Sequence, residues 1–173
     1  HNPIGKMFSQ AELYRISEIC LRKGVILCSD EIHCDLVYSG NHHVPVASLN
    51  PEIAAQTITL MAPSKTFNLA GLQCSVAIIP NPELRKQYLS ARHGVIPWVN
   101  LLGLVAVQAA YQDGQEWLDQ LLGYLQGNRD CVYEFVQAEF DGIEIGLPQA
   151  TYLAWLDCRT SQISGNPYQF FLE

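Results

Sequence analysis

A lysine and an aspartate in two short motifs are the residues of this chain best suited to chemistry. Lys65 lies in Met61-Ala62-Pro63-Ser64-Lys65-Thr66-Phe67-Asn68-Leu69-Ala70-Gly71-Leu72, and Asp30 lies in Ser29-Asp30-Glu31-Ile32-His33. A lysine amine can bond covalently to a carbonyl group, and a carboxylate can keep a heterocyclic nitrogen protonated. The two side chains together could bind and activate a carbonyl-bearing cofactor.

Each of these residues also has an ordinary structural explanation. A lysine beside Pro63, Ser64 and Thr66 is more commonly a solvated surface charge, although the hydroxyls and backbone N–H groups of such a loop could also bind a phosphate. Asp30 is harder to explain by solvation, because an acid that follows an apolar run must face a cleft or cap a helix. Glu31 beside it could be the structural member of the pair.

Other polar and aromatic residues favour structural explanations. His42-His43 could suggest a metal, since imidazole is a common neutral ligand. Adjacent histidines rarely converge on one ion, and no carboxylate or thiolate falls at a recognised spacing, so we expect a flexible surface loop and no metal site. The three tryptophans are expected in the core; they are Trp98, Trp117 and Trp155.

Short apolar runs predict the strands that position the chemistry. Val25-Ile26-Leu27-Cys28-Ser29 is typical of a strand covered on both faces, and it ends at Asp30. Residues 57–61 form a second candidate strand that leads into the Lys65 loop, and residues 75–79 form a third. Because ligands of parallel α/β sheets bind at the carboxyl ends of the strands, both motifs are expected at one site.

Helical patterns fill the rest of the chain. Ser9 and Glu12 form a capping-box signature, and the apolar spacing that follows predicts a helix over residues 10–23 that ends at Gly24. Further helices are predicted over 82–92, from about 97 to 112 and from about 114 to 140. The alternation in residues 143–145 and 152–156 predicts strands with one covered face.

The predicted elements indicate an α/β fold in three parts. Residues 1–113 are expected to form part of a large domain with a mostly parallel sheet. A long inter-domain helix is expected over 114–141, and the truncated start of a smaller C-terminal α+β domain over 142–173. The chain opens on His1-Asn2-Pro3-Ile4-Gly5 without Met and stops just after a predicted helix start at Pro167, so we expect an internal fragment.

Composition excludes several classes of partner. The formal net charge is −7 without a basic run, which argues against nucleic acid. No apolar stretch approaches the ~20 residues that cross a bilayer, and no secretion signal precedes the first helix, so we expect a cytoplasmic location and no membrane association. The six cysteines are widely spaced without a C-x-x-C pair, which predicts reduced thiols.

Taken in order, three segments resemble the motifs of pyridoxal phosphate (PLP) enzymes of the class I/II aminotransferase family, fold type I. They are His1 to Gly5, Ser29 to Tyr38 and Ala62 to Leu72. In detail they resemble the cystathionine β-lyase (C–S lyase) branch. The resemblance extends through Tyr111, Trp117-Leu118 and Pro148 to Trp155, and therefore covers essentially the whole chain.

The resemblance implies a role for each matching position. Asn2 matches the asparagine that hydrogen-bonds the cofactor's phenolic O3′, Asp30 the aspartate at the pyridine nitrogen, and Ser64 a hydroxyl near the phosphate. Lys65 matches the catalytic lysine that forms the Schiff base. His33 stands where many aminotransferases carry a tyrosine to O3′, and is expected to contact the cofactor in the lyase branch.

Some family features differ or are absent. Gln73 stands where the wider class often has a phosphate-binding arginine, and Ala150 where glycine is commoner. Tyr152 lies in the segment that resembles the substrate-facing strand. The phosphate-cradling loop and the stacking aromatic are expected before residue 1, and the arginine for the substrate carboxylate after residue 173.

The resemblance implies a homodimeric enzyme that acts on a small amino acid. Its expected reaction is β-elimination from cystathionine or related cysteine conjugates, giving a thiol, pyruvate and ammonia, with the fragment alone inactive. The same chemistry with reprotonation at the cofactor carbon would give an aminotransferase, which the residues leave open. A non-catalytic truncated or interaction fragment is a further alternative.

Overall fold

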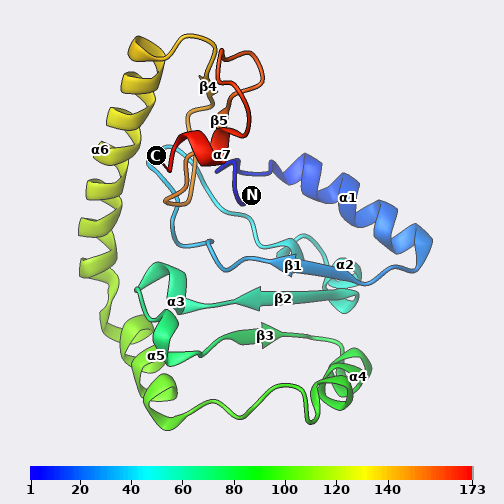
Figure 1. Ribbon diagram of the computed structural model, residues 1–173. Helices are drawn as coiled ribbons and strands as arrows, with labels where there is room; N and C mark the ends of the chain where they lie inside the picture. Colours follow the sequence, from blue (N-terminus) through cyan, green and yellow to red (C-terminus); the bar gives the residue numbers. More distant parts are fainter. Residues whose placement is uncertain (173) are drawn as a thin grey trace.

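The computed structural model describes residues 1–172 and is built around a three-stranded sheet (Figure 1). β1 (Leu27–Asp30), β2 (Thr57–Met61) and β3 (Val76–Ile78) lie side by side in that order. β1 and β2 are parallel, with Asp30 opposite Leu60, and α2 (Pro51–Ala55) lies in the connection between them. β3 is antiparallel to β2. The predicted α/β class is confirmed, with one antiparallel strand added to the parallel pair.

Helix α1 (Gln10–Lys23) has the predicted bounds and the predicted capping box. The Ser9 hydroxyl accepts a hydrogen bond from the Glu12 N–H group at 3.3 Å, and the Glu12 carboxylate accepts one from the Ser9 N–H group at 2.8 Å. Gly24 ends the helix in the left-handed conformation with φ 64°. Satisfying the free N–H groups at the helix start is what fixes this boundary.

The remaining helices connect the sheet to a second, smaller sheet. The first sheet is followed by α4 (Pro82–Arg92), α5 (Leu101–Asp113) and the long α6 (Gln115–Glu139), which runs along one side of the molecule (Figure 1). At its far end β4 (Glu144–Ile145) pairs with β5 (Leu156–Asp157). The short elements are η1 (Val46–Ser48), α3 (Pro63–Thr66), η2 (Ala70–Leu72) and α7 (Pro167–Phe170).

The second sheet has its own small core. Val136 of α6 packs with Ile143 and Ile145, and all three are buried. The strand predicted over 152–156 was wrong in extent, because only Leu156 belongs to β5. Thr151 adopts a left-handed backbone with φ 71°, which turns the chain out of the extended conformation just before the predicted strand.

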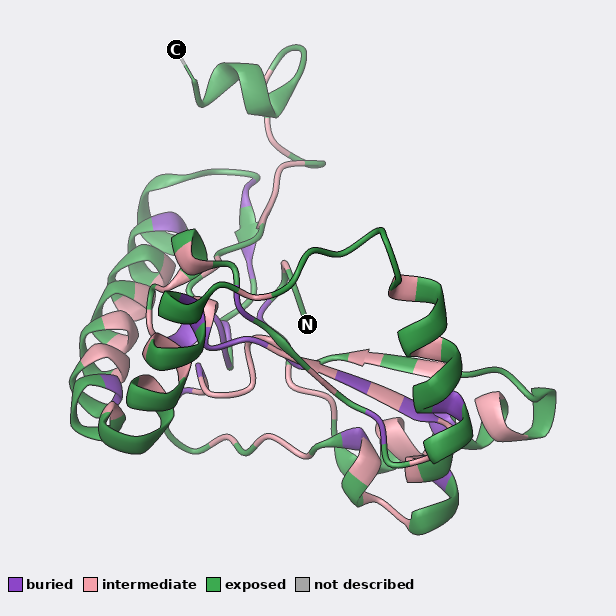
Figure 2. Ribbon diagram, turned by 90° about the horizontal axis from the view of Figure 1, so that it is seen from below, coloured by how far each residue is buried: buried purple, intermediate pink, exposed green. Residues whose placement is uncertain are grey.

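Two expectations about burial are also wrong. The strand expected from Val25, with both faces covered, is β1, which begins at Leu27 and alternates between half-buried and exposed residues. Its only partner strand among residues 1–172 is β2. All three tryptophans are exposed: Trp98 (91%), Trp117 (46%) and Trp155 (55%). Trp98 lies in the connection between α4 and α5, where Arg92 contacts its ring face at 5.6 Å. Figure 2 shows the extensive exposed surface of the helices.

Within residues 1–172, no helix combines the length and the apolar character needed to cross a bilayer.

Gly5 fastens the N-terminal turn to a segment far along the chain. Its carbonyl accepts hydrogen bonds from the N–H groups of Gln149 (2.9 Å) and Ala150 (3.0 Å). Its φ is 65°, and a Cβ there would lie 2.7 Å from Pro148 Cβ and 2.8 Å from the Ala150 carbonyl oxygen. Only glycine therefore fits between the two segments.

Gly5→Ala is expected to destabilise the protein through two additive effects. The left-handed backbone costs a residue with a Cβ about 1–2 kcal/mol, and the clash with Pro148 and Ala150 adds about 1–3 kcal/mol. Gly40→Ala is the matched control, because Gly40 has φ 83° but open space around it. Urea unfolding of both variants separates the two effects; equal losses in the two variants would contradict the close approach at Gly5.

Candidate active site

The two principal candidate residues follow adjacent parallel strands. Asp30 is the last residue of β1, and Lys65 lies on α3, just past the end of β2. The Glu31 N–H group donates to the Leu60 carbonyl at 2.9 Å, which extends the ladder one residue beyond Asp30. The sheet therefore brings both motifs to one edge, as the sequence predicted.

The Asp30 carboxylate is exposed and lightly engaged. One oxygen, Oδ1, accepts a hydrogen bond from the Ile32 N–H group at 3.3 Å. Within the described residues it takes part in no ion pair and in no other hydrogen bond. An unpaired carboxylate at a strand end can accept a hydrogen bond from a cationic donor.

His33 lies close enough to Asp30 and Lys65 for their charges to shift the pKa of its imidazole. Burial lowers the pKa of its imidazole, the nearby positive charge of Lys65 lowers it further, and the Asp30 carboxylate opposes both effects. Its Nδ1 atom is buried and has no hydrogen-bond partner among residues 1–172. The ring also packs edge-on against Tyr152, with a centroid separation of 5.5 Å. The lowered pKa favours the neutral form of the His33 imidazole, and no described residue hydrogen-bonds its Nδ1 atom.

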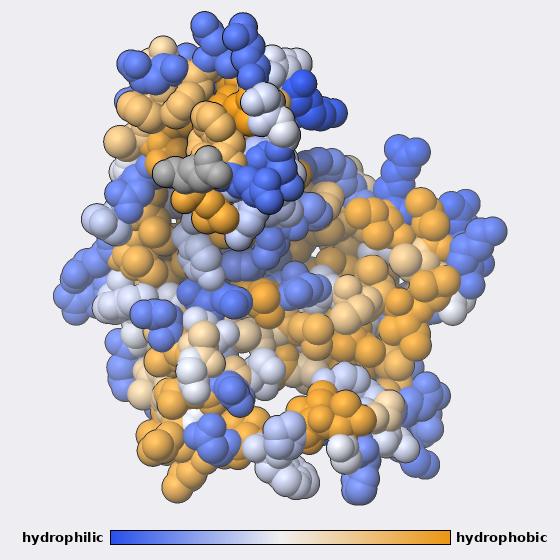
Figure 3. All heavy atoms as spheres, viewed as in Figure 1, coloured by the Kyte–Doolittle hydropathy of each residue, from blue (hydrophilic) through white to orange (hydrophobic). Residues whose placement is uncertain are grey.

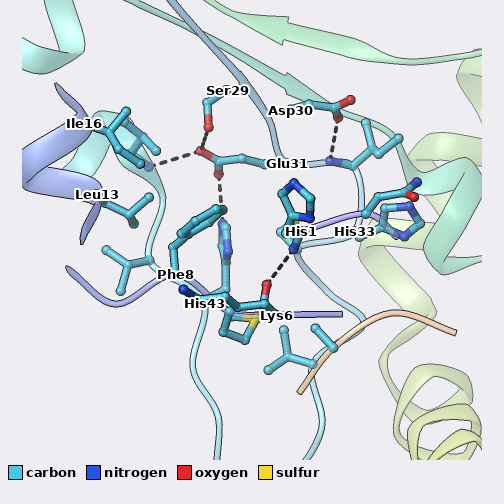
Figure 4. A pocket seen from close by; sticks show the side chains of 18 of the residues that line it. His1, Lys6, Phe8, Leu13, Ile16, Ser29, Asp30, Glu31, His33 and His43 are labelled. Carbon is cyan, nitrogen blue, oxygen red and sulfur yellow. Dashed lines mark hydrogen bonds and ion pairs between the residues drawn. The ribbon is translucent and has the colours of Figure 1, made fainter. Parts of the chain in front are cut away.

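A cavity of about 370 Å³ opens beside these groups (Figure 4). Asn2, Asp30 and His33 all line it, and so do Ala150 and Thr151 from the far end of the chain. Its apolar wall is formed by residues of α1 and neighbouring segments: Phe8, Leu13, Ile16, Leu27 and Val46. The structure therefore brings Asn2, Asp30 and His33 together around one space, whereas Ser64 and Lys65 lie outside its lining.

The Lys65 loop is held by its neighbours. The N–H group of Phe67 donates to the Pro63 carbonyl at 2.8 Å, and that of Leu69 donates to the Ser64 carbonyl at 3.1 Å. Among residues 1–172 the side chains of Ser64 and Lys65 have no hydrogen-bond partner, and both residues are half-buried. Both polar groups are consequently available to a ligand.

A side-chain contact that the sequence did not reveal joins the two motifs. The buried Thr66 hydroxyl donates to Asp35 Oδ2 at 2.8 Å. This bond ties the residue after Lys65 to the loop that carries His33. Burial, together with the Asp35 carboxylate, raises the pKa of the neighbouring Cys34 thiol to about 12, so that thiol stays protonated.

Glu31 is the structural neighbour of Asp30, and His43 is its partner. Glu31 is buried, and its carboxylate accepts hydrogen bonds from the Ser29 hydroxyl (2.9 Å) and the Val46 N–H group (3.1 Å). The His43 Nε2 atom lies 2.9 Å from its other oxygen. The expectation that His42-His43 forms a flexible surface loop is therefore wrong for His43, because this long-range contact anchors it.

Glu31→Gln is expected to lower stability at pH 7 by about 1–3 kcal/mol, because it weakens hydrogen bonds to a buried carboxylate. Burial raises the pKa of Glu31, but the bonds from His43, Val46 and Ser29 outweigh it and lower the pKa below its ordinary value of 4.5. The stabilisation is thus present above about pH 4.5 and is lost as pH falls through the folded-state pKa.

Thermal unfolding of the wild type and of Glu31→Gln from pH 3 to pH 8 measures this difference, with the exposed Glu18→Gln as a control. The two curves should converge at the acid end. A difference that grows on acidification would contradict the assignment.

The fold and these groups define an α/β domain with polar side chains at the carboxyl ends of two adjacent parallel strands. The family model for aminotransferase class I and II matches residues 1–166, and the chain belongs to this family. The predicted family resemblance is confirmed.

Individual relatives point to one branch of the family. The chain is 40% identical to the cystathionine β-lyase PatB of Bacillus subtilis over 91% of its own length. It superposes on the crystal structure of OvoB with a TM-score of 0.95 and 43% identity over 99% of the chain. For the PLP-bound C–S lyase from Staphylococcus hominis the TM-score is 0.83, with 41% identity over 91% of the chain.

The chain spans less than half of each of these relatives. It covers 41% of PatB, 45% of the OvoB chain and 39% of the S. hominis chain. The fold of the matched part is thus that of the fold type I enzymes, and the predicted fold class is confirmed.

Proposed function

We propose that the protein to which this chain belongs is a PLP-dependent C–S β-lyase. Its substrates would be cystathionine or related cysteine conjugates, and its products a thiol, pyruvate and ammonia. The observation that carries the proposal is the meeting of Asp30 and Lys65 at adjacent strand ends, with His33 within reach of both charges. The names of PatB and of the S. hominis enzyme support the lyase branch.

The free polar groups of the site fit the cofactor. PLP presents a protonated ring nitrogen, a phenolic oxygen, an aldehyde and a phosphate. Within the described residues, Asp30 retains a carboxylate oxygen without a partner, His33 has a buried nitrogen without a partner, and Lys65 has no ion pair. An orphaned buried nitrogen calls for a hydrogen-bond partner, and a bound cofactor could supply one.

Each proposed residue has one task. Bound PLP would supply an electron sink for the electrons of the substrate's Cα–H bond. Lys65 would hold the cofactor covalently until substrate arrives and would then accept the Cα proton at Nζ. Asp30 would keep the ring nitrogen protonated, and the Asn2 amide would donate to the phenolic oxygen.

The remaining two residues complete the polar set. The Ser64 hydroxyl would donate to the phosphate from the start of α3. His33, neutral because burial and Lys65 lower its pKa, would contact the cofactor without adding charge beside the lysine.

Product analysis tests the proposed reaction. The whole protein, loaded with PLP and given cystathionine, is expected to release pyruvate and homocysteine without any added keto acid. Transfer of the amino group to a keto acid, with no pyruvate formed, would instead assign the aminotransferase reaction.

We also infer the predicted domain division and a homodimer for the whole protein. The long α6 and the separate pair β4 and β5 support a large-domain part over 1–113, a connecting helix over 114–141 and a small-domain part over 142–173.

The homodimer is supported by large apolar side chains that stay exposed around the connection between α4 and α5, where hydrophobic residues reach the surface in Figure 3: Val95, Ile96, Trp98, Leu101, Leu102, Leu104 and Val105. Such a patch is typical of a protein interface. The cytoplasmic location stays a prediction.

A further inference from the structure

Thr151 holds a backbone conformation that its side chain disfavours. It is 1% exposed and has φ 71°. A β-branched residue in the left-handed region is rare, because its Cβ crowds the backbone. Such a conformation persists only where the surroundings impose it, and it is concentrated at functional sites.

Three hydrogen bonds impose this conformation. The Thr151 N–H group donates to the Leu36 carbonyl at 2.7 Å, and the Thr151 carbonyl accepts from the Tyr38 hydroxyl at 2.5 Å. The Thr151 hydroxyl oxygen accepts from the Leu153 N–H group at 3.2 Å. Leu36 and Tyr38 belong to the loop that carries His33, so the strained residue is fastened to the site.

Tyr38 is itself fixed from the other side. The guanidinium of Arg129 on α6 lies 4.5 Å from the centre of the Tyr38 ring, and it donates to the Pro148 carbonyl at 3.2 Å. α6 therefore supports both the hydrogen-bond donor to Thr151 and the segment that leads into it.

The direction of Tyr152 follows from this arrangement. Its ring meets that of His33 edge-on, with 5.5 Å between centroids and 74° between planes. The His33 imidazole makes no hydrogen bond to any described residue, and its Nδ1 atom is buried. Edge-on aromatic packing is thus the contact that orients the imidazole.

We propose that Thr151 is a positioning residue that aims Tyr152 at His33, and that Tyr152 orients the His33 imidazole and shields it from water. The contact between the rings is independent of the proposed lyase reaction, whereas its use in catalysis rests on that function. Neither Thr151 nor Tyr152 touches the reacting atoms in this assignment.

Four groups lie around His33, and the three charged ones act on its protonation. They are the Lys65 ammonium on α3, the Asp30 carboxylate on β1, the α-amino group of His1 and the Tyr152 ring. Burial is the largest influence and lowers the His33 pKa from its ordinary value of 6.5. Removing the Tyr152 ring admits water, so the pKa should rise toward that value.

Histidine labelled with ¹³C in the whole protein without PLP, where Lys65 keeps its ammonium group, gives a direct measurement. The His33 signal, assigned with His33→Gln, is followed by NMR from pH 5 to pH 8. We expect Tyr152→Ala to raise the His33 pKa by about 0.5–1 unit. Tyr152→Phe keeps the ring and should leave the pKa unchanged, as should the control Tyr124→Ala, whose ring is exposed on α6.

A second pair of variants tests Thr151. Thr151→Val keeps the shape of the side chain but removes the oxygen that accepts a hydrogen bond from the Leu153 N–H group. Tyr152 should then be less well positioned, so the His33 pKa should rise, as in Tyr152→Ala. Thr151→Ser keeps the oxygen and should restore the wild-type value. If Thr151→Val does not fold, the comparison of Tyr152→Ala with Tyr152→Phe still tests the proposal.

An unchanged His33 pKa in Tyr152→Ala, or an equal rise in Tyr152→Phe, would overturn the proposal. Because the readout is a titration, a protein without lyase activity could still confirm the positioning role. A protein with lyase activity could equally refute it.

Discussion

Replacing Lys65 with alanine is expected to abolish covalent binding of PLP and to remove almost all of the proposed lyase activity of the whole protein. Loss of proton transfer alone lowers kcat by about 10²–10⁴-fold, and loss of covalent attachment adds to this. Lys65 is half-buried on α3 and has no partner among residues 1–172, so its removal breaks no structural contact. The absorbance band of the lysine-bound cofactor and the rate of pyruvate release measure the two effects.

Lys86→Ala is the matched control, since Lys86 is exposed on α4. It should keep both the absorbance band and the rate. Added small primary amines should restore part of the activity of Lys65→Ala, because they can replace the missing base. Near-normal turnover in Lys65→Ala without added amine would refute the assignment.

Asp30→Asn should lower kcat by about 10²–10³-fold, the usual effect of removing one group that stabilises developing charge. Asparagine has nearly the same shape and retains Oδ1, which accepts the hydrogen bond from the Ile32 N–H group at 3.3 Å. The local turn should therefore survive, and the negative charge that we propose for the ring nitrogen should be lost. Cofactor affinity should fall as well.

Asp141→Asn serves as the control, because Asp141 is exposed in the turn between α6 and β4. Steady-state kinetics with cystathionine, together with thermal unfolding, distinguishes a chemical effect from a folding defect. If Asp30→Asn kept the wild-type kcat, the Asp30 carboxylate would not act on the ring nitrogen.

Local signals explain why the sequence could place the Asp30 and Lys65 motifs at one edge of the sheet. The capping box at Ser9 and the apolar runs before Asp30 and Lys65 depend only on nearby residues, and they fixed α1, β1 and β2 within a few positions. The parallel pairing of β1 and β2 then places both motifs at one edge. Secondary structure and strand polarity were sufficient for this part of the site.

The contacts that hold the site come from residues far apart in the chain. His43 reaches Glu31, Thr66 reaches Asp35, and Thr151 reaches Leu36. No local pattern distinguishes these residues from ordinary polar loop residues. The left-handed backbone of Thr151 is a tertiary effect that opposes its own propensity, so the strand predicted after it was too long.

The exposure of the tryptophans could not be predicted from the local sequence either. A tryptophan in apolar sequence is buried only if another surface covers it, and Trp98 in this chain has Arg92 against one face and little else. Its exposure agrees with the inferred interface around the connection between α4 and α5.

Reductive trapping of the whole protein tests the central claim most directly. Borohydride makes the bond between PLP and its lysine permanent, and mass spectrometry of the digested protein then locates the label. We expect the label on Lys65, in the peptide that contains Pro63-Ser64-Lys65-Thr66. A label on any other lysine, or none on the PLP-loaded protein, would contradict the account.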